Sequence, residues 1–298
     1  MYHLVYGIIY LFSLLPLRVL YLFSDFFYFL VFYIIGYRKS VVLNNLQSAF
    51  PEKSEKERIR IAKQFYKNFI DTLIETVKLF SAGKNFIMRH VKADISIFHE
   101  YFEQKQKVQV HMGHNFNWEL QNLYGSINAK QVFLGVYMPL ENKIVNRVLL
   151  KMRSKFGTVL MPATQMRKAM LPYRNETYIL GLIADQTPAN PDNAYWVEFF
   201  GRPTAFLKGP EKGAKAGNHP VVFSFCTKTS RGHYELNLKV LEQNPALLDE
   251  GVLTARYAQC LEENIRRHPD MWLWSHRRWK HEWNEKYKII HPAEAGSN

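Results

Sequence analysis

The sequence predicts an α/β protein with a mixed, largely parallel central sheet flanked by helices, and with an N-terminal hydrophobic membrane helix or hairpin. Two observations predict this class. The first 37 residues contain only two fully charged side chains, Arg18 and Asp25. From about residue 107, short apolar runs alternate with amphipathic stretches, a pattern typical of a parallel sheet covered by helices. The chain of 298 residues is long enough to bury a large core.

We call residues 1–37 the leader. It is long enough to span a bilayer once. Pro16 and Arg18 interrupt it, so a helical hairpin lying in the membrane interface is an alternative. A basic n-region and a small-residue cleavage site are both missing, which argues against a cleavable signal peptide. Arg38 and Lys39 follow at once, and the positive-inside rule then predicts a cytoplasmic location for the rest. A buried hairpin in a soluble protein is the competing interpretation.

A helical lead-in is expected over residues 40–100. Pro51 ends one helix, and Ser54 is a candidate N-cap for the next. Apolar residues then recur at mostly three- and four-residue steps, which predicts one core-facing stripe. This stripe contains Ile59, Ile61, Phe65, Phe69, Leu73 and Val77.

Strand and helix patterns alternate over residues 107–298, the predicted α/β core. We expect strands at 107–112, 131–138, 157–161, 178–185, 196–200, 221–228 and 234–241. We expect helices at 118–127, 142–157, 164–174 and 250–267. The predicted boundaries are therefore 1–39 for a membrane-anchoring segment and 40–298 for the remaining domain.

The chain is basic, with 39 Lys and Arg against 26 Asp and Glu and a net charge of +13. Such an excess favours an anionic partner, such as a phospholipid surface, a phosphorylated substrate, an acidic carrier protein or nucleic acid. Cys226 and Cys260 are too few for a disulfide framework, and a reducing compartment fits them. Four of the six tryptophans lie within residues 271–283 beside basic residues, a composition that suits lipid headgroups. Next to an apolar leader, we expect no nucleic acid as partner.

The segment HMGHNFNWEL, residues 111–120, places His114 five positions before Glu119. Neither a helix nor a strand brings side chains at this spacing together, so the chain must bend between them, for instance at a strand-to-helix corner. The carboxyl edge of an open α/β sheet is the usual position of ligands. A His held by a carboxylate is a general base with a fixed tautomer. Without a Ser or Cys nucleophile in the segment, a substrate hydroxyl would attack directly.

Two other interpretations of this segment remain open from the residues alone. His111, His114 and Glu119 are candidate metal ligands, although their spacing matches none of the helical zinc motifs. Alternatively, His114 is a structural histidine near the start of a helix.

The GHNFNWEL block resembles the HxxxxD/E motif of glycerolipid-type acyltransferases, in the form seen in the bacterial lipid A biosynthesis (late lauroyl/myristoyl) acyltransferase family. Further blocks follow the family order from about residue 40 to residue 283. These blocks are NNLQSAFPEKS, IETVKLF, VYMPLENKIVNRVL, ADQTP, FFGRPTAFLKGP and MWLWSHRRWK.

The resemblance implies a membrane-bound enzyme that moves an acyl chain from an acyl-carrier-protein thioester, or sometimes acyl-CoA, to a hydroxyl of a lipid. In the lipid A branch, the acceptor is a lipid A precursor. The resemblance also implies no metal and no further cofactor. Another bacterial lipid, such as an aminolipid or a glycolipid, is an alternative acceptor. A metal-dependent lipid hydrolase and a non-catalytic membrane scaffold are more remote alternatives.

By position in these blocks, His114 resembles the family's general base and Glu119 its orienting partner. Asp185, at the end of an apolar strand, resembles a family acid near the site. Candidate substrate-binding residues are Asn117, Arg147, Arg202 and Lys208. Arg147 follows the PLEN turn, Gly201 suits a tight turn that presents Arg202, and Lys208 precedes a helix start that attracts anions. A solvated helix face, a plain hairpin turn or a helix cap is the structural alternative for each of these charged residues.

Overall fold

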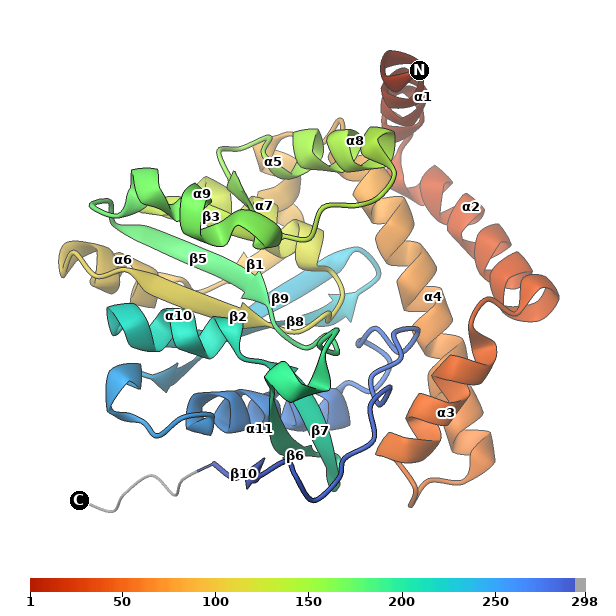
Figure 1. Ribbon diagram of the computed structural model, residues 1–298. Helices are drawn as coiled ribbons and strands as arrows, with labels where there is room; N and C mark the ends of the chain where they lie inside the picture. Colours follow the sequence, from red (N-terminus) through yellow and green to blue (C-terminus); the bar gives the residue numbers. More distant parts are fainter. Residues whose placement is uncertain (293–298) are drawn as a thin grey trace.

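A seven-stranded sheet forms the centre of the computed structural model, which describes residues 1–292 (Figure 1). Its strands lie in the order β1-β9-β8-β2-β5-β3-β4, and all neighbours are parallel except β8 and β9. Their bounds are β1 Val91–Ala93, β2 Val108–Met112, β3 Val132–Tyr137, β4 Val159–Pro162, β5 Tyr178–Ile183, β8 Val221–Ser230 and β9 His233–Glu242. The predicted α/β class with a largely parallel sheet is confirmed. Residues 293–298 of the predicted core lie outside the described part of the chain.

The central strands β2 and β5 are almost entirely buried, as expected for parallel strands covered on both faces, and β5 is also largely apolar. In their register, Met112 of β2 lies opposite Ile183 of β5. Both strands therefore end at the same edge of the sheet, and the two loops that follow them lie next to each other.

Helices cover both faces of the sheet: α7 and α8 lie on one face, and α10 and α11 lie on the other (Figure 1). The helices of the domain are α3 Lys39–Ala49, α4 Glu55–Leu79, α5 Lys84–His90, α6 Ser96–Glu103, α7 Trp118–Asn128, α8 Lys143–Arg153, α9 Met166–Met170, α10 Gly209–Gly217 and α11 Val252–Arg267. The predicted helix over 164–174 is broken, because single 3-10 turns flank α9 on both sides.

Helix α4 begins with the predicted N-cap. The Ser54 side chain and the Glu57 carboxylate bond each other's backbone amides in a capping box, which satisfies two otherwise free N–H groups. Ile61 and Phe65 of the predicted stripe are buried in the core. Leu73 is not, since 49% of its surface is exposed.

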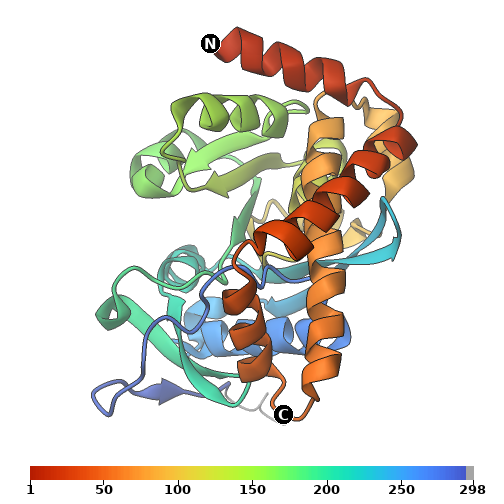
Figure 2. The ribbon, with the colours of Figure 1, turned by 90° about the vertical axis from the view of Figure 1, so that its right-hand side faces the viewer.

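The leader folds into two helices that lie on the domain. Helix α1 spans Tyr2–Ser13, and α2 spans Leu17–Phe29 and continues as a π-helical turn η1, Leu30–Ile35. Pro16 lies in the break between α1 and α2. The segment Leu17–Ile35 is long and apolar enough to cross a membrane, as predicted. In Figure 2, α2 runs diagonally across the face of α4, and α1 turns away at the top.

A second, small sheet has the order β10-β6-β7, with bounds β6 Ala194–Phe199, β7 Arg202–Leu207 and β10 Ile289–Ile290. Sequence patterns missed β7, because a proline and polar residues interrupt its alternation. The turn between β6 and β7 contains Phe200 and Gly201, both with positive φ. Gly201 adopts φ +67° without a side-chain penalty, in agreement with the predicted turn.

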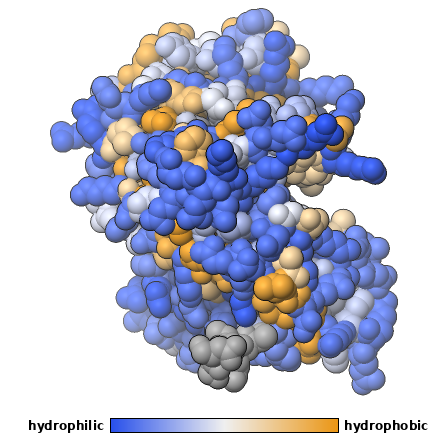
Figure 3. All heavy atoms as spheres, turned by 90° about the vertical axis from the view of Figure 1, so that its left-hand side faces the viewer, coloured by the Kyte–Doolittle hydropathy of each residue, from blue (hydrophilic) through white to orange (hydrophobic). Residues whose placement is uncertain are grey.

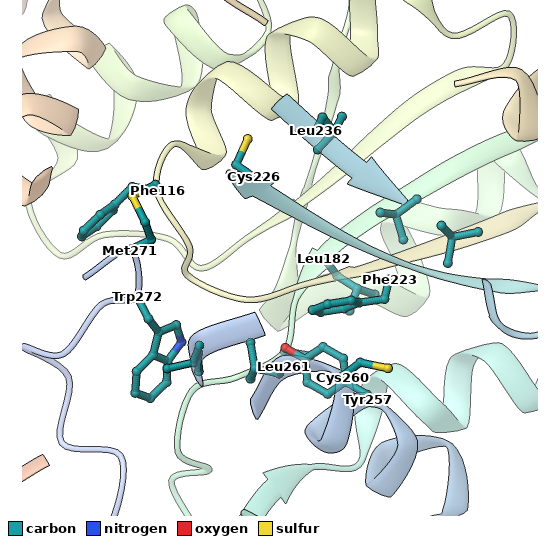
Figure 4. Close-up of a cluster of buried hydrophobic side chains, with 14 of the residues drawn as sticks. Phe116, Leu182, Phe223, Cys226, Leu236, Tyr257, Cys260, Leu261, Met271 and Trp272 are labelled. Carbon is teal, nitrogen blue, oxygen red and sulfur yellow. The ribbon is translucent and has the colours of Figure 1, made fainter. Parts of the chain in front are cut away.

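An aromatic and aliphatic core lies beneath the carboxyl edge of β2, where Phe116, Tyr257, Leu261 and Trp272 converge from separate parts of the chain (Figure 4). Trp272, Trp274 and Arg278 are buried, with at most 1% of their surface exposed. The expectation that the Trp-rich segment contacts lipid headgroups is therefore wrong for these three side chains. They anchor the C-terminal segment inside the protein instead.

Candidate active site

The chain leaves β2 at Met112 and enters α7 at Trp118 through a tight corner. Gly113 is required there, because a Cβ atom at this position would lie 2.5 Å from Leu261 Cδ1 and 3.2 Å from Asp185 Oδ2. Asn117 is the N-cap of α7, and its side-chain oxygen accepts a hydrogen bond from the Leu120 amide. The strand-to-helix corner predicted from the sequence is therefore present.

This corner brings His114 onto Asp185. Nδ1 of His114 lies 2.5 Å from Oδ1 of Asp185, and the backbone N–H of His114 donates to Oδ2 at 2.7 Å. A carboxylate accepts but does not donate, so Nδ1 carries the proton and Nε2 keeps a free lone pair. The imidazole is thus held in the tautomer that a general base needs.

The carboxylate of Asp185 is surrounded by hydrogen-bond donors. Its Oδ2 atom also accepts a hydrogen bond from the indole Nε1 of Trp272 at 2.7 Å, and the residue is 2% exposed. Burial raises the pKa of Asp185, but His114 and the Trp272 indole more than offset this, so that its pKa lies below the usual value. The carboxylate therefore stays ionised beside the imidazole.

The Nε2 side of His114 faces a shallow pocket. The Gln186 side-chain amide lies 3.3 Å from Nε2, and Gln186 is exposed, so it can move aside for a substrate. The edge of the Trp118 indole packs against the imidazole, with ring centroids 5.4 Å apart. The pocket is lined by His114, Asp185, Gln186, Trp272, Leu273 and His276.

The carboxylate that contacts His114 is therefore Asp185 and not Glu119. Glu119 points toward α8, where its carboxylate accepts two hydrogen bonds from Arg153 Nε and one from Nη2, the latter at 2.6 Å. It also accepts a bond from the Trp118 indole at 3.1 Å. The reason is geometric: α7 has already begun at Trp118, and its first turn directs Glu119 toward the neighbouring helix. Glu119 reaches the imidazole only through Trp118.

The three side chains considered as metal ligands have separate partners. His111 is buried in β2 and contacts the Gln109 side chain at 3.0 Å, while His114 contacts Asp185 and Glu119 binds Arg153. Among residues 1–292, no three His, Cys, Asp or Glu side chains gather in a way that could hold a metal ion.

Asn117, predicted to bind substrate, has a structural role. It is completely buried, and its amide donates to Oε2 of Glu75 at 2.9 Å. Glu75 also accepts hydrogen bonds from the Tyr21 and Tyr234 hydroxyls at 2.7 and 2.6 Å. Burial raises the pKa of Glu75 although these bonds act against the shift. This buried network ties the leader, α4 and the corner together.

The three basic candidates lie in separate surroundings. Arg147 is exposed on α8, and its guanidinium lies 4.2 Å from the centre of the Tyr2 ring in the leader. Arg202 lines an open groove of about 660 Å³ between α3 and the β6–β7 turn. Lys208 packs over the Tyr195 ring at 4.9 Å, at the N-cap of α10. None of the three lines the pocket at His114.

Sequence reasoning missed several residues that form the pocket. Gln186 follows Asp185 directly, and its place in the ADQTP block was the available signal. Trp272 and His276 lie more than 150 residues after His114, in the Trp-rich segment whose composition predicts contact with lipid headgroups. Their positions depend on tertiary contacts that no local pattern encodes.

His276 is held in a neutral form. Its Nε2 atom accepts a hydrogen bond from the Thr187 amide at 3.1 Å, so the proton resides on Nδ1. Burial, together with the nearby charge of Arg278, lowers the pKa of His276 to about 4. The pocket thus contains two imidazoles of different character, one paired with a carboxylate and one neutral.

Comparison with known proteins identifies the family of the chain. Residues 1–281 match the family model described as bacterial lipid A biosynthesis acyltransferase. A protein named "Lipid A biosynthesis acyltransferase" from Haemophilus influenzae (strain ATCC 51907 / DSM 11121 / KW20 / Rd) is 23% identical over 252 residues, which cover 84% of this chain and 79% of the relative. The family model covers nearly the whole chain, including the leader and the corner at His114. The protein therefore belongs to the bacterial lipid A biosynthesis acyltransferase family and is an acyltransferase by membership.

Proposed function

We propose that this protein is a membrane-bound O-acyltransferase that moves a fatty acyl chain from an acyl-carrier-protein thioester to a hydroxyl of a lipid A precursor. The observation that carries the proposal is the contact between His114 Nδ1 and Asp185, with Nε2 turned to the pocket. This contact revises the roles predicted from the sequence. In the proposal, Asp185 orients the imidazole of His114, whereas Glu119 supports Trp118.

In the proposed reaction, the acceptor hydroxyl oxygen attacks the thioester carbonyl carbon while His114 Nε2 removes the hydroxyl proton. Asp185 stabilises the imidazolium that forms, since its carboxylate lies 2.5 Å from Nδ1. The tetrahedral intermediate then expels the carrier thiolate, which takes the proton back from His114. The products are an ester and a free carrier thiol. General base catalysis of this kind typically contributes about 10²- to 10⁴-fold.

Gln186 provides a hydrogen-bond donor next to Nε2 of His114. Its amide lies 3.3 Å from His114 Nε2 and is released when a substrate hydroxyl takes its place. We propose that it then donates to the developing oxyanion, an interaction that is typically worth about 3–4 kcal/mol. The thioester is already activated, so the proposed reaction includes no metal and no nucleotide.

The location follows from charge and hydropathy. We propose that the apolar leader attaches the protein to the bacterial inner membrane and that the catalytic domain lies on the cytoplasmic side, which the positive charges of Arg38 and Lys39 favour. The exposed cations Arg147 and Arg202 are proposed to bind anionic groups of the lipid or the carrier, away from the reacting atoms.

The test is an assay with the purified full chain, labelled acyl-acyl-carrier protein and a lipid A precursor. An acylated lipid should form in the presence of EDTA, and His114→Ala should reduce turnover by about 10²- to 10⁴-fold while leaving the protein folded. His3→Ala, on the exposed start of α1, is the matched control and should retain full turnover. Full activity of His114→Ala would rule out the base. Failure of the wild-type protein with this acceptor, but turnover with another lipid, would reject the lipid A precursor.

A further inference from the structure

Both ends of the leader lie on the same folded domain. Near its start, the Tyr2 ring lies 4.2 Å under the Arg147 guanidinium, and the Tyr6 ring lies 4.0 Å from Lys151 Nζ, both on α8. Directly after its end, Nη1 of Arg38 donates to the carbonyl of Ser275 at 2.9 Å. A helix that crosses a bilayer separates its ends by a hydrocarbon layer of about 30 Å. If α2 spanned the bilayer, its two ends would lie on opposite sides of the membrane, so one folded domain could not contact both.

The middle of the leader is fixed to α4 by polar contacts. The Ser24 hydroxyl donates to Asp71 at 2.7 Å, and the Tyr21 hydroxyl donates to Glu75 at 2.7 Å. Before α2 begins, Lys78 donates to the carbonyl of Ser13 at 2.8 Å. These bonds are partly or fully buried, so breaking them would leave unpaired polar groups. The pairing of α2 with α4 is therefore part of the folded state.

An ion pair lies at the centre of the apolar segment. Asp25 stands midway along Leu17–Ile35, and its carboxylate accepts two hydrogen bonds from Arg231, at 2.8 and 3.1 Å. Half of the Asp25 side chain is exposed. In a spanning orientation, this half-exposed pair would lie at the bilayer midplane, where charged groups are strongly disfavoured.

The outer face of the leader is nevertheless apolar. Exposed side chains recur at helical spacing on both helices, so that each presents an apolar stripe away from the domain. The α1 stripe contains Leu4, Ile8 and Leu11, and the α2 stripe contains Leu22, Phe26 and Phe29, all between 51% and 69% exposed. The opposite side of the molecule is largely hydrophilic, with small scattered apolar patches (Figure 3).

Cations flank these stripes. Arg18 is exposed at the start of α2, and Lys63 of α4 is exposed beside η1, 5.7 Å from the Tyr33 ring. Apolar side chains next to exposed cations match a leaflet of anionic phospholipid, which offers hydrocarbon beneath negative headgroups.

We infer that the leader does not cross the membrane but lies in the plane of one leaflet, with the outer stripes of α1 and α2 inserted and both ends on the side of the catalytic domain. This inference rests on the proposed membrane attachment and specifies its mode. It selects the interfacial hairpin over the single span.

The first test uses the full chain with a single added cysteine, either His3→Cys or Ser40→Cys, in sealed bacterial membrane vesicles. Both positions are exposed, whereas Cys226 and Cys260 are buried, so the wild-type chain gives the background. An impermeant maleimide should label both variants from the same side, in inverted vesicles only. Labelling of the two positions from opposite sides would overturn the inference. Same-side labelling from the periplasmic face would support the inference and reject the cytoplasmic location.

The second test measures flotation with vesicles of phosphatidylethanolamine and phosphatidylglycerol. The double variant Leu22→Glu/Phe26→Glu should lower the bound fraction about tenfold or more with little change in melting temperature. Leu247→Glu, at a site 83% exposed on a loop outside the leader, is the matched control and should bind normally. Equal binding of the double variant and the wild type would contradict the inserted face. Absence of wild-type binding would reject membrane attachment itself.

Discussion

Oδ1 of Asp185 lies 2.5 Å from Nδ1 of His114, and the two residues occupy equivalent positions beyond neighbouring parallel strands. Met112 and Ile183 are paired in the register, and His114 and Asp185 each follow two residues later. The sheet therefore positions both groups at its carboxyl edge. Two buried, hydrogen-bonded strands support His114 and Asp185, and this maintains a precise contact between residues that are 71 positions apart in the sequence.

Asp185→Asn is expected to reduce turnover by about 10²- to 10⁴-fold. The amide cannot stabilise an imidazolium, and its NH₂ group competes with Nδ1–H for the same contact. Steady-state rates with labelled acyl-carrier protein measure the effect. Asp192→Asn, an exposed acid outside the pocket, is the control and should retain wild-type turnover. A rate for Asp185→Asn within threefold of the wild type would refute the orienting role.

Trp272→Phe tests the electrostatics of the same carboxylate. Burial raises the pKa of Asp185, while hydrogen bonds from His114 and the Trp272 indole lower it. Removal of the indole N–H should move this pKa upward and leave more negative charge on the carboxylate to stabilise the imidazolium, so the acid limb of the turnover–pH profile should shift to higher pH. Turnover at pH 8 should fall only modestly, because the carboxylate is still ionised there. An unshifted acid limb would argue against a role of Trp272 beyond packing.

Glu119→Gln should act mainly on stability. It leaves the partly buried Arg153 guanidinium, 24% exposed, without its charged partner, a loss that reaches about 3–5 kcal/mol where an ion pair is fully buried. The double variant Glu119→Gln/Arg153→Met removes both charges and should recover much of the melting temperature. If Glu119 instead contacted the base directly during catalysis, turnover would collapse in both variants without a matching loss of stability. Thermal unfolding and rates measured side by side separate the two roles.

Protein stability should decrease as the pH falls from about 6.5 to about 4. Burial lowers the pKa of His111 to about 3 and that of His276 to about 4, whereas an unfolded histidine titrates near 6.5. In this range the unfolded chain binds more protons than the folded chain, so lower pH favours unfolding. His276→Gln should flatten the slope of melting temperature against pH, and an unchanged slope would contradict the assignment. His3→Gln removes an exposed imidazole and serves as the control.

Deletion of residues 1–37 should destabilise the domain as well as detach it from membranes. Glu75 and Asp71 would lose their hydrogen bonds from Tyr21 and Ser24, and α4 would expose the surface that Leu20 covers. We expect the truncated chain to melt at lower temperature or to aggregate in the absence of detergent. A truncated protein that is soluble and as stable as the full chain would show that the leader is not part of the fold.

The sequence was sufficient to predict the class of fold, because buried parallel strands and amphipathic helices have different hydrophobic periods. It also located the corner at His114, since a polar, glycine-containing stretch separated a strand from a helix. The partner of His114 could not be inferred from spacing. Glu119 is near in sequence but is directed away by the first turn of α7, whereas Asp185 is distant in sequence and adjacent through strand pairing.

Short or irregular elements were also not predicted from the sequence. β7 and β10 are formed by pairing with β6 and not by a strong local pattern. The Trp-rich segment had the composition of a membrane interface, but its large rings fill the core beneath the pocket, as Trp272 and Trp274 do. Composition reports what a side chain can contact, and only the fold decides which contact it makes.

Asn45 of α3 donates through its amide to the carbonyls of both Trp274 and His276, each at 2.7 Å, and Arg38 bonds Ser275 between them. The segment 272–276, which forms one wall of the pocket, is thus held by hydrogen bonds from α3 and from the residue that precedes it. Displacement of the leader by a harsh detergent would weaken these hydrogen bonds and so change the shape of the pocket. With the proposed membrane attachment, lipid contact and turnover should therefore be linked through these backbone carbonyls, and measured activity should depend on the detergent used for solubilisation.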